Sequence, residues 1–140
     1  MIYLDTSVIV AYYCPEALSR HVQDLLREQV KPALSFLTEV EFTSAVAKKV
    51  RQNELGSVDG NRILAKFTSH ADTGLFQIIP VKKHHYQLAK SWIGLLTTPL
   101  RTLDALHLAI ASSEELQLVT SDRSFFQAAE MLDVEARLIG

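Results

Sequence analysis

The chain has 140 residues, 48% of them hydrophobic, with 16 acidic against 14 basic side chains and a formal net charge of −2. This composition predicts one globular domain over residues 1–140 and excludes a disordered or fibrous chain. The charge excludes a protein that holds nucleic acid chiefly by an overall positive field, and the lone Cys14 excludes a cysteine-rich zinc site, so we expect a cytoplasmic protein without a membrane-spanning segment.

The first half of the chain alternates short apolar runs with amphipathic stretches. Ile2 to Leu4 predict a buried strand that ends at Asp5. The spacing of apolar residues then predicts a helix over residues 8–13 and another that begins at Pro15. The other elements expected in this half are a strand at 31–35, a helix at 37–52 that Gly56 closes, and a helix at 57–69.

The second half continues the same alternation. Its expected elements are a strand at 75–81, a helix at 85–96 that Pro99 ends, a helix at 103–113, a strand at 117–120, a helix at 125–132 and a strand at 136–139. Strands that alternate with helices at these separations are joined by right-handed crossovers. The sequence therefore predicts an α/β domain whose mainly parallel sheet has helices on both faces.

Four acidic residues lie close to the ends of predicted strands or the starts of predicted helices. Asp5 follows the first strand, Glu41 lies near the start of the helix after the second, Asp104 opens a later helix, and Asp122 follows the strand at LVTS. Because working groups of parallel sheets gather at the carboxyl ends of the strands, these four carboxylates could converge. Each one alone could instead be a helix cap or first-turn acid that stabilises its helix by about 1 kcal/mol.

Convergence of several carboxylates would require a counter-charge. Ionised carboxylates in one low-dielectric pocket repel each other, and a hard divalent cation is the simplest partner that lets them coexist. Mg²⁺ or Mn²⁺ prefers oxygen ligands and binds readily through carboxylates, waters and substrate phosphate oxygens. The acids therefore favour metal-dependent cleavage of a phosphodiester bond, which needs no serine or cysteine nucleophile.

Four segments carry a resemblance to a known family. They are MIYLDTS at 1–7, TEVEFTSA at 38–45, LRTLDALHLAIA at 100–111 and LVTSDRSFF at 118–126, and together they resemble a PIN domain over nearly the whole chain. The short length and the DAL-H-LA helix are most similar to the VapC-like toxins of type II toxin–antitoxin pairs. The resemblance implies a parallel sheet of about five strands and an acidic metal site at Asp5, Glu41, Asp104 and Asp122, with the hydroxyls of Thr6 and Ser121 beside it.

The second acid of that set has a rival in Glu39, which lies two residues before Glu41. Helical spacing does not separate the two glutamates. The resemblance favours Glu41, because the family places its glutamate three residues after a threonine and just before an apolar residue, as in Thr38, Glu41 and Phe42.

The resemblance also implies an activity and its partners. It implies an endoribonuclease dependent on Mg²⁺ or Mn²⁺ that cleaves RNA by metal-activated water, forms a homodimer and is silenced by a small antitoxin presenting a basic side chain. The alternatives are a free-standing PIN-domain nuclease for RNA processing and an inactive PIN-like module that binds RNA or protein. The chain lacks the glycine-rich phosphate loops of nucleotide-binding domains, and Ser7 stands where a haloacid-dehalogenase-like phosphatase would carry a second aspartate.

Histidines and arginines near the acids have less specific interpretations. His107, one helical turn after Asp104, is expected to pair within the domain rather than to touch substrate. His84 and His85, beside two lysines, are expected on a solvated surface rather than as a metal pair. Arg101 and Arg123 could contact RNA phosphates or pair with the carboxylates, and the sequence favours neither.

Overall fold

The computed structural model describes residues 1–15, 17–28 and 31–140. Five strands form one sheet in the order β3-β2-β1-β4-β5, and each neighbouring pair is parallel. The strands are β1 (Ile2–Leu4), β2 (Ala33–Ser35), β3 (Gln77–Ile79), β4 (Gln117–Thr120) and β5 (Ala136–Leu138). The α/β class and the five-stranded parallel sheet are therefore confirmed.

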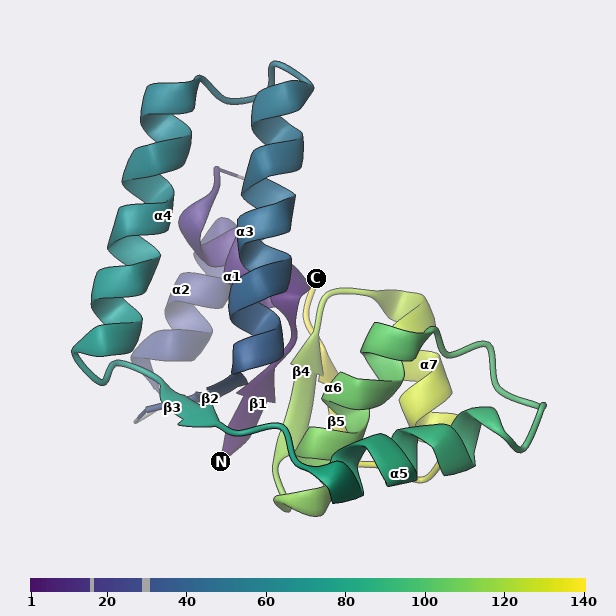
Figure 1. Ribbon diagram of the computed structural model, residues 1–140. Helices are drawn as coiled ribbons and strands as arrows, with labels where there is room; N and C mark the ends of the chain where they lie inside the picture. The colour runs from purple at the N-terminus through teal and green to yellow at the C-terminus, as the bar shows by residue number, and fades with distance from the viewer. Residues whose placement is uncertain (16, 29–30) are drawn as a thin grey trace.

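Seven helices in the described residues cover the two faces of this sheet (Figure 1). One face packs against α1 (Thr6–Tyr13), α2 (Ser19–Arg27), α3 (Phe36–Arg51) and α4 (Ser57–Asp72), and the other against α5 (Lys83–Ile93), α6 (Thr102–Ser113) and α7 (Arg123–Met131). Two separate apolar clusters result. Alternation along β1 explains them, because Ile2 and Leu4 join the first cluster whereas Tyr3 joins the second.

Several predicted boundaries are wrong for local reasons. A turn at residues 17–18 follows Pro15, so α2 begins only at Ser19. The strand β3 ends before Pro80, which has no backbone N–H to give to a ladder. Gly56 does not close α3. Asn53 ends that helix in the left-handed conformation, with φ of 59°, which asparagine tolerates better than most residues.

The helices α3 and α4 form an antiparallel hairpin whose far end projects beyond the rest of the molecule in Figure 1. Gly60 of α4 is buried against α3, and a Cβ atom there would lie 2.9 Å from Cγ2 of Val50. Its lack of a side chain therefore lets the two helices approach closely.

The carboxyl ends of β1, β2 and β4 determine where the functional side chains can lie. Asp5 follows β1 and caps α1, while Asp122 follows β4 and caps α7. Ser35 ends β2 and caps α3, the helix that carries Glu41. These loops therefore bring three helix starts to one edge of the sheet. Across the described ranges, no helix combines the length and apolarity needed to cross a membrane.

Candidate active site

Asp5 lies at the centre of this edge and is 5% exposed. Its Oδ2 accepts a hydrogen bond of 2.7 Å from the Thr120 hydroxyl, and its Oδ1 accepts bonds from the Ser7 hydroxyl and the Val8 N–H. Burial raises the pKa of Asp5, against the opposing effect of these bonds. Asp5 therefore caps α1 through Oδ1, as the capping explanation expects. Capping alone does not explain why Oδ2 is also hydrogen-bonded, to Thr120.

Thr120, the last residue of β4, connects two of the predicted acids. Besides donating to Asp5, its hydroxyl accepts a 3.0 Å bond from the backbone N–H of Asp122. Asp122 in turn accepts from the Phe125 N–H at 3.2 Å. The sequence assigned a supporting hydroxyl to Ser121, but that residue contributes its backbone N–H, which donates to Ser7. The hydroxyl beside Asp5 comes instead from Thr120, one residue earlier in the chain.

Glu41 is half-buried on α3, and its Oε1 accepts two hydrogen bonds. The Thr6 hydroxyl donates at 2.8 Å, and Nε2 of His107 donates to the same oxygen. Burial alone would raise the pKa of Glu41, but the bond and charge of His107 together with the Thr6 bond hold it below its ordinary value. In the described part of the chain no hydrogen bond to Oε2 of Glu41 is found.

Glu39 lies elsewhere on the same helix. It lines a cleft between α3 and α4, with Leu64, Phe67 and Asp72 among its neighbours. The two glutamates therefore differ in surroundings: Glu41 faces the start of α1 and the middle of α6, whereas Glu39 faces the hairpin partner of its own helix.

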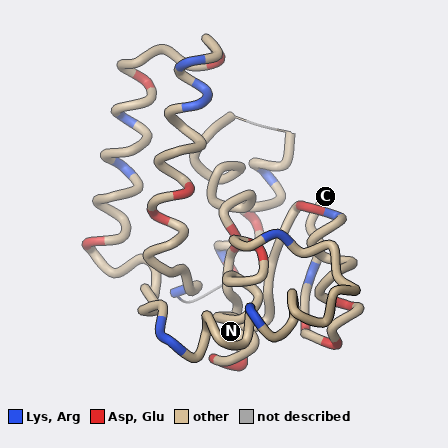
Figure 2. Tube along the Cα trace, turned by 45° about the vertical axis from the view of Figure 1, so that its right-hand side comes forward, with Lys and Arg blue, Asp and Glu red and all other residues tan. Residues whose placement is uncertain are grey.

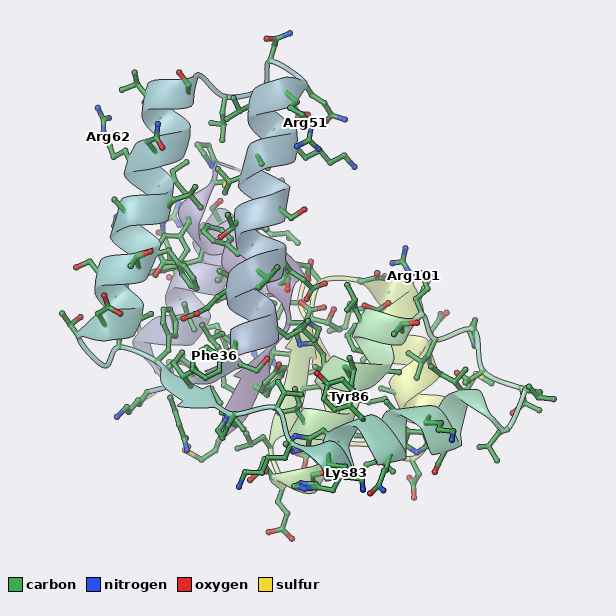
Figure 3. The ribbon with its side chains drawn as sticks, in the orientation of Figure 1. Phe36, Arg51, Arg62, Lys83, Tyr86 and Arg101 are labelled. Carbon is green, nitrogen blue, oxygen red and sulfur yellow. The ribbon has the colours of Figure 1, made fainter. Side chains whose placement is uncertain are left out.

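Asp104 is half-buried in the first turn of α6. Its pKa is raised first by burial and then by the negative charges of Asp122 and Glu41, while Arg101 opposes the shift. Nε of Arg101 lies 3.6 Å from Oδ2 of Asp104, so this arginine pairs with a carboxylate. Its side chain is 81% exposed and extends outward at the start of α6 in Figure 3. It therefore remains accessible to a phosphate.

The four predicted acids thus share one electrostatic neighbourhood. The negative charges of Asp122 and Glu41 contribute to the raised pKa of Asp104. His107 has a lowering effect on the pKa values of all three of its acidic neighbours, Asp5, Glu41 and Asp104. Figure 2 shows acidic segments from distant parts of the chain gathered near the middle of the molecule. A cleft of about 330 Å³ adjoins Asp104 and Asp122, with Arg101 on its rim.

The donor set is suited to a hard cation. All four side chains offer carboxylate oxygens, which Mg²⁺ and Mn²⁺ prefer over nitrogen or sulfur. Among the described residues, no three of these acids bring ligand oxygens within 4.8 Å of one another. Mg²⁺ commonly binds through one or two carboxylates and keeps several waters, so such spacing remains compatible with it. Acids that repel each other are also expected to stand apart without a cation.

One trio of potential ligands does meet the 4.8 Å spacing within the described ranges, namely His84, His85 and Glu114. His85 is buried, which corrects the expectation that it lies on a solvated surface. Its Nδ1 accepts the Lys82 N–H at 2.9 Å, so the proton of a neutral ring lies on Nε2, which faces Glu114 at 3.3 Å. A ligand nitrogen must be unprotonated, and this arrangement therefore disfavours metal binding.

Sequence reasoning missed the interior partners of the acids. His107 pairs within the domain as expected, but the sequence did not indicate that Glu41 and Tyr3 are its partners. Tyr3 was assigned only to a buried strand, although its hydroxyl is hydrogen-bonded in the core. The sequence offered one related signal: the spacing of Asp104 and His107 places His107 on the same helix face as a predicted acid, without naming Tyr3 or Glu41 as its partners.

Known proteins share the family and the fold of this chain. The family model for the PIN domain matches residues 2–131. The solved structure of FitAcB from Neisseria gonorrhoeae is 25% identical, with a TM-score of 0.73 over 97% of this chain and 96% of the other. No curated protein sequence matches the chain.

Two further solved structures share the fold at lower identity. A VapC toxin from Mycobacterium tuberculosis, described as cleaving the sarcin–ricin loop, is 14% identical with a TM-score of 0.74 over 91% of this chain and 95% of the other. A toxin–antitoxin complex from Klebsiella pneumoniae is 19% identical, with a TM-score of 0.62 over 90% of each chain.

Proposed function

Because this chain belongs to the PIN domain family, we propose that it is an endoribonuclease dependent on Mg²⁺ or Mn²⁺ and the toxin of a toxin–antitoxin pair. The observation that carries the proposal is the meeting of carboxylates from separate elements at one edge of the sheet. Thr120 bonds to both Asp5 and the backbone of Asp122, and Asp122 lines one cleft with Asp104. Glu41 bonds to His107, one helical turn after Asp104. Such like charges at one edge of a sheet favour a divalent cation as their partner.

Asp5, Glu41, Asp104 and Asp122 would hold the cation in this proposal. When bound, Mg²⁺ or Mn²⁺ lowers the pKa of an attacking water and stabilises the charge on the leaving oxygen. The protein's own contribution is orientation. Thr120 and Ser7 hold Asp5, and Thr6 and His107 hold Glu41, so the carboxylates need little rearrangement. Arg101 is suited to an RNA phosphate next to Asp104.

The experiment that tests this function is incubation of the purified protein with total RNA, with and without Mg²⁺ or Mn²⁺, followed by sequencing of the cleavage ends. We expect metal-dependent cleavage that Asp5→Asn, Asp104→Asn and Glu41→Gln each abolish, because each removes one ligand charge. Glu39→Gln is the matched control and should remain active, since Glu39 lies between α3 and α4. Full activity of the Asp5 or Asp104 variant would overturn the assignment, and equal losses in both glutamate variants would overturn the choice of Glu41.

The proposed partner is a small antitoxin that inserts a basic side chain among these acids. An arginine is attracted to a carboxylate cluster as a cation is, so antitoxin and metal should compete. The structural similarity to a toxin–antitoxin complex supports this partner. Expression of the chain alone in the host cytoplasm should slow growth, and co-expression with a neighbouring small gene should restore it. Harmless expression, with no binding protein encoded nearby, would favour a free-standing RNA-processing nuclease.

We further propose that residues 1–140 act as a single PIN domain and assemble as a homodimer. Exposed apolar side chains between α5 and α6 support a partner surface. They line a groove of about 430 Å³ that includes Tyr86, Ile93 and Leu96.

A binding module that lost catalysis remains the third candidate, and retention of RNA binding without metal-dependent cleavage would favour it.

A further inference from the structure

A chain of polar side chains runs through the interior of the protein to Glu41. Oγ of Ser35 lies 2.9 Å from the Tyr3 hydroxyl, which lies 2.6 Å from Nδ1 of His107. Nε2 of His107 then donates to Oε1 of Glu41. Ser35, Tyr3 and His107 are all at most 1% exposed, whereas the side chain of Glu41 reaches the surface. The chain therefore connects the core to one predicted metal ligand.

The elements that this chain joins are those that build the acidic site. Ser35 caps α3, Tyr3 lies in the central strand β1, and His107 lies on α6. The series of hydrogen bonds ends at Glu41, which is again on α3, within two turns of the cap residue Ser35 where the series began. Asp104 lies one turn before His107 on α6. The hydrogen bonds thus cross the sheet edge and tie the helix bearing Glu41 to the helix bearing Asp104.

We propose that His107, held by Tyr3 and Ser35, is a positioning residue that sets Glu41 and Asp104 in the separation that cation binding requires. The inference rests on the proposed function, because it concerns the same site. His107 and Thr6 both donate to Oε1 of Glu41, which restricts rotation of the carboxylate and leaves Oε2 for the cation. His107 does not act on the substrate in this scheme.

A purely structural explanation accounts less well for these residues. Buried polar groups give little net stability, and apolar side chains of similar size can replace a complete hydrogen-bonded set with little loss. Here the set is complete, since no buried side-chain nitrogen or oxygen in the described residues lacks a partner. It also ends on a carboxylate whose other oxygen accepts no hydrogen bond from the described residues. Partners that orient a ligating side chain commonly change metal affinity by about 10- to 100-fold when removed.

The test measures Mn²⁺ binding by isothermal titration calorimetry on the full chain, without RNA. The variants are His107→Leu, which removes both ring nitrogens, and His107→Gln, whose amide can still donate to Glu41. Tyr3→Phe removes only the hydroxyl between His107 and Ser35. The matched control is His85→Gln, because His85 is also a buried histidine but bonds to Lys82 and Glu114. Circular dichroism establishes that each variant is folded.

We expect His107→Leu to raise the Kd for Mn²⁺ by at least about tenfold. His107→Gln should recover part of this loss, Tyr3→Phe should show an intermediate loss, and His85→Gln should bind as the wild type does. RNA cleavage by His107→Leu should recover when Mn²⁺ is raised to saturation, because the substitution acts through cation binding.

A folded His107→Leu variant with wild-type Mn²⁺ affinity would overturn the inference while leaving the proposed function intact. If that variant does not fold, Tyr3→Phe carries the test, and an unchanged Kd in the folded Tyr3 variant would overturn the role of the chain. Equal losses of affinity in His107→Leu and His85→Gln would also overturn it, since they would reflect destabilisation alone. A wild-type protein that binds no Mn²⁺ would instead reject the metal site itself, and the positioning role with it.

Discussion

Asp5 combines two roles that oppose each other in the metal-free protein. Its carboxylate caps α1, yet burial raises its pKa, so the ionised form is held at an energetic cost. Asparagine is as good a helix cap as aspartate. We therefore expect Asp5→Asn to melt at the same temperature as the wild type or higher when no metal is present, as measured by differential scanning calorimetry.

Addition of Mn²⁺ should reverse that order. A ligand that binds only the folded state stabilises it by about 2.7 kcal/mol at roughly 100 times its Kd. The melting temperature of the wild type should rise by several degrees with Mn²⁺, and that of Asp5→Asn should not. A large loss of stability in metal-free Asp5→Asn would show that the residue serves the fold instead.

Arg101 shows why an exposed ion pair matters for binding more than for stability. It lies 3.6 Å from Asp104 with an 81% exposed side chain, and such pairs contribute at most about 1 kcal/mol. Arg101→Gln should therefore leave the melting temperature nearly unchanged. If Arg101 contacts a single-stranded RNA phosphate, the slope of log Kd against log salt concentration should fall by about 0.7 in Arg101→Gln, measured with Asp5→Asn in both proteins to prevent cleavage while keeping Asp104. An unchanged slope would leave Arg101 as a carboxylate partner only.

At the scale of the elements, the α3–α4 hairpin depends on a close approach at Gly60. Alanine is preferred over glycine in helices by about 1 kcal/mol, but its Cβ would lie 2.9 Å from Val50, whose side chain is stiff at χ1. Overpacking typically costs about 1–3 kcal/mol. We expect Gly60→Ala to lower the free energy of unfolding measured in urea. The control is Gly56→Ala, since a Cβ at Gly56 meets no atom within 4 Å. Equal stability of the Gly60 variant and the wild type would mean that the helices can move apart freely.

His85 connects the start of α5 to the end of α6 and makes that packing sensitive to acid. Burial lowers its pKa below the ordinary value of 6.5, although Glu114 opposes the shift. The unfolded chain then binds the proton more readily than the folded chain. The stabilisation by neutral His85 is therefore fully present above about pH 6.5 and is lost as the pH falls through the lowered pKa of the folded protein.

This linkage predicts a difference between two melting curves. The melting temperature of the wild type should fall more than that of His85→Gln when the pH drops from about 7 to about 5. The comparison removes the contribution of Asp5 and Asp104, whose raised pKa values act in the opposite direction in both proteins. Parallel curves for the two proteins would contradict the buried, neutral state of His85.

The whole molecule exposes an apolar groove between α5 and α6 that suits a second copy of the chain. Leu96 is 89% exposed there and adopts a φ of 64°, a conformation that leucine rarely takes. Leu96→Asn should relieve the backbone and remove apolar surface. We expect the wild type to be dimeric by light scattering and Leu96→Asn to dissociate more readily without losing stability. A monomeric wild type would reject the proposed homodimer.

The sequence by itself determined the α/β class and the positions of the acids along the chain. Those features follow from local patterns: apolar runs that form buried strands, amphipathic spacing, and an acid directly after a strand such as Asp5. The helix cap at Asn53 and the late start of α2 escaped prediction. Alternative local conformations of a turn differ by less than a few kcal/mol, so the turn residues alone do not decide between them.

Only the tertiary structure decided which side chains meet. Tyr3 and His107 are 104 residues apart in the chain, and Thr120 and Asp5 are 115 apart, yet both pairs are hydrogen-bonded. Such contacts arise when parallel strands bring distant residues to one sheet edge, and periodicity carries no information about the partner across that edge. The different surroundings of Glu39 and Glu41 have the same origin, since the packing of α3 against its neighbours, rather than any signal within α3, separates them.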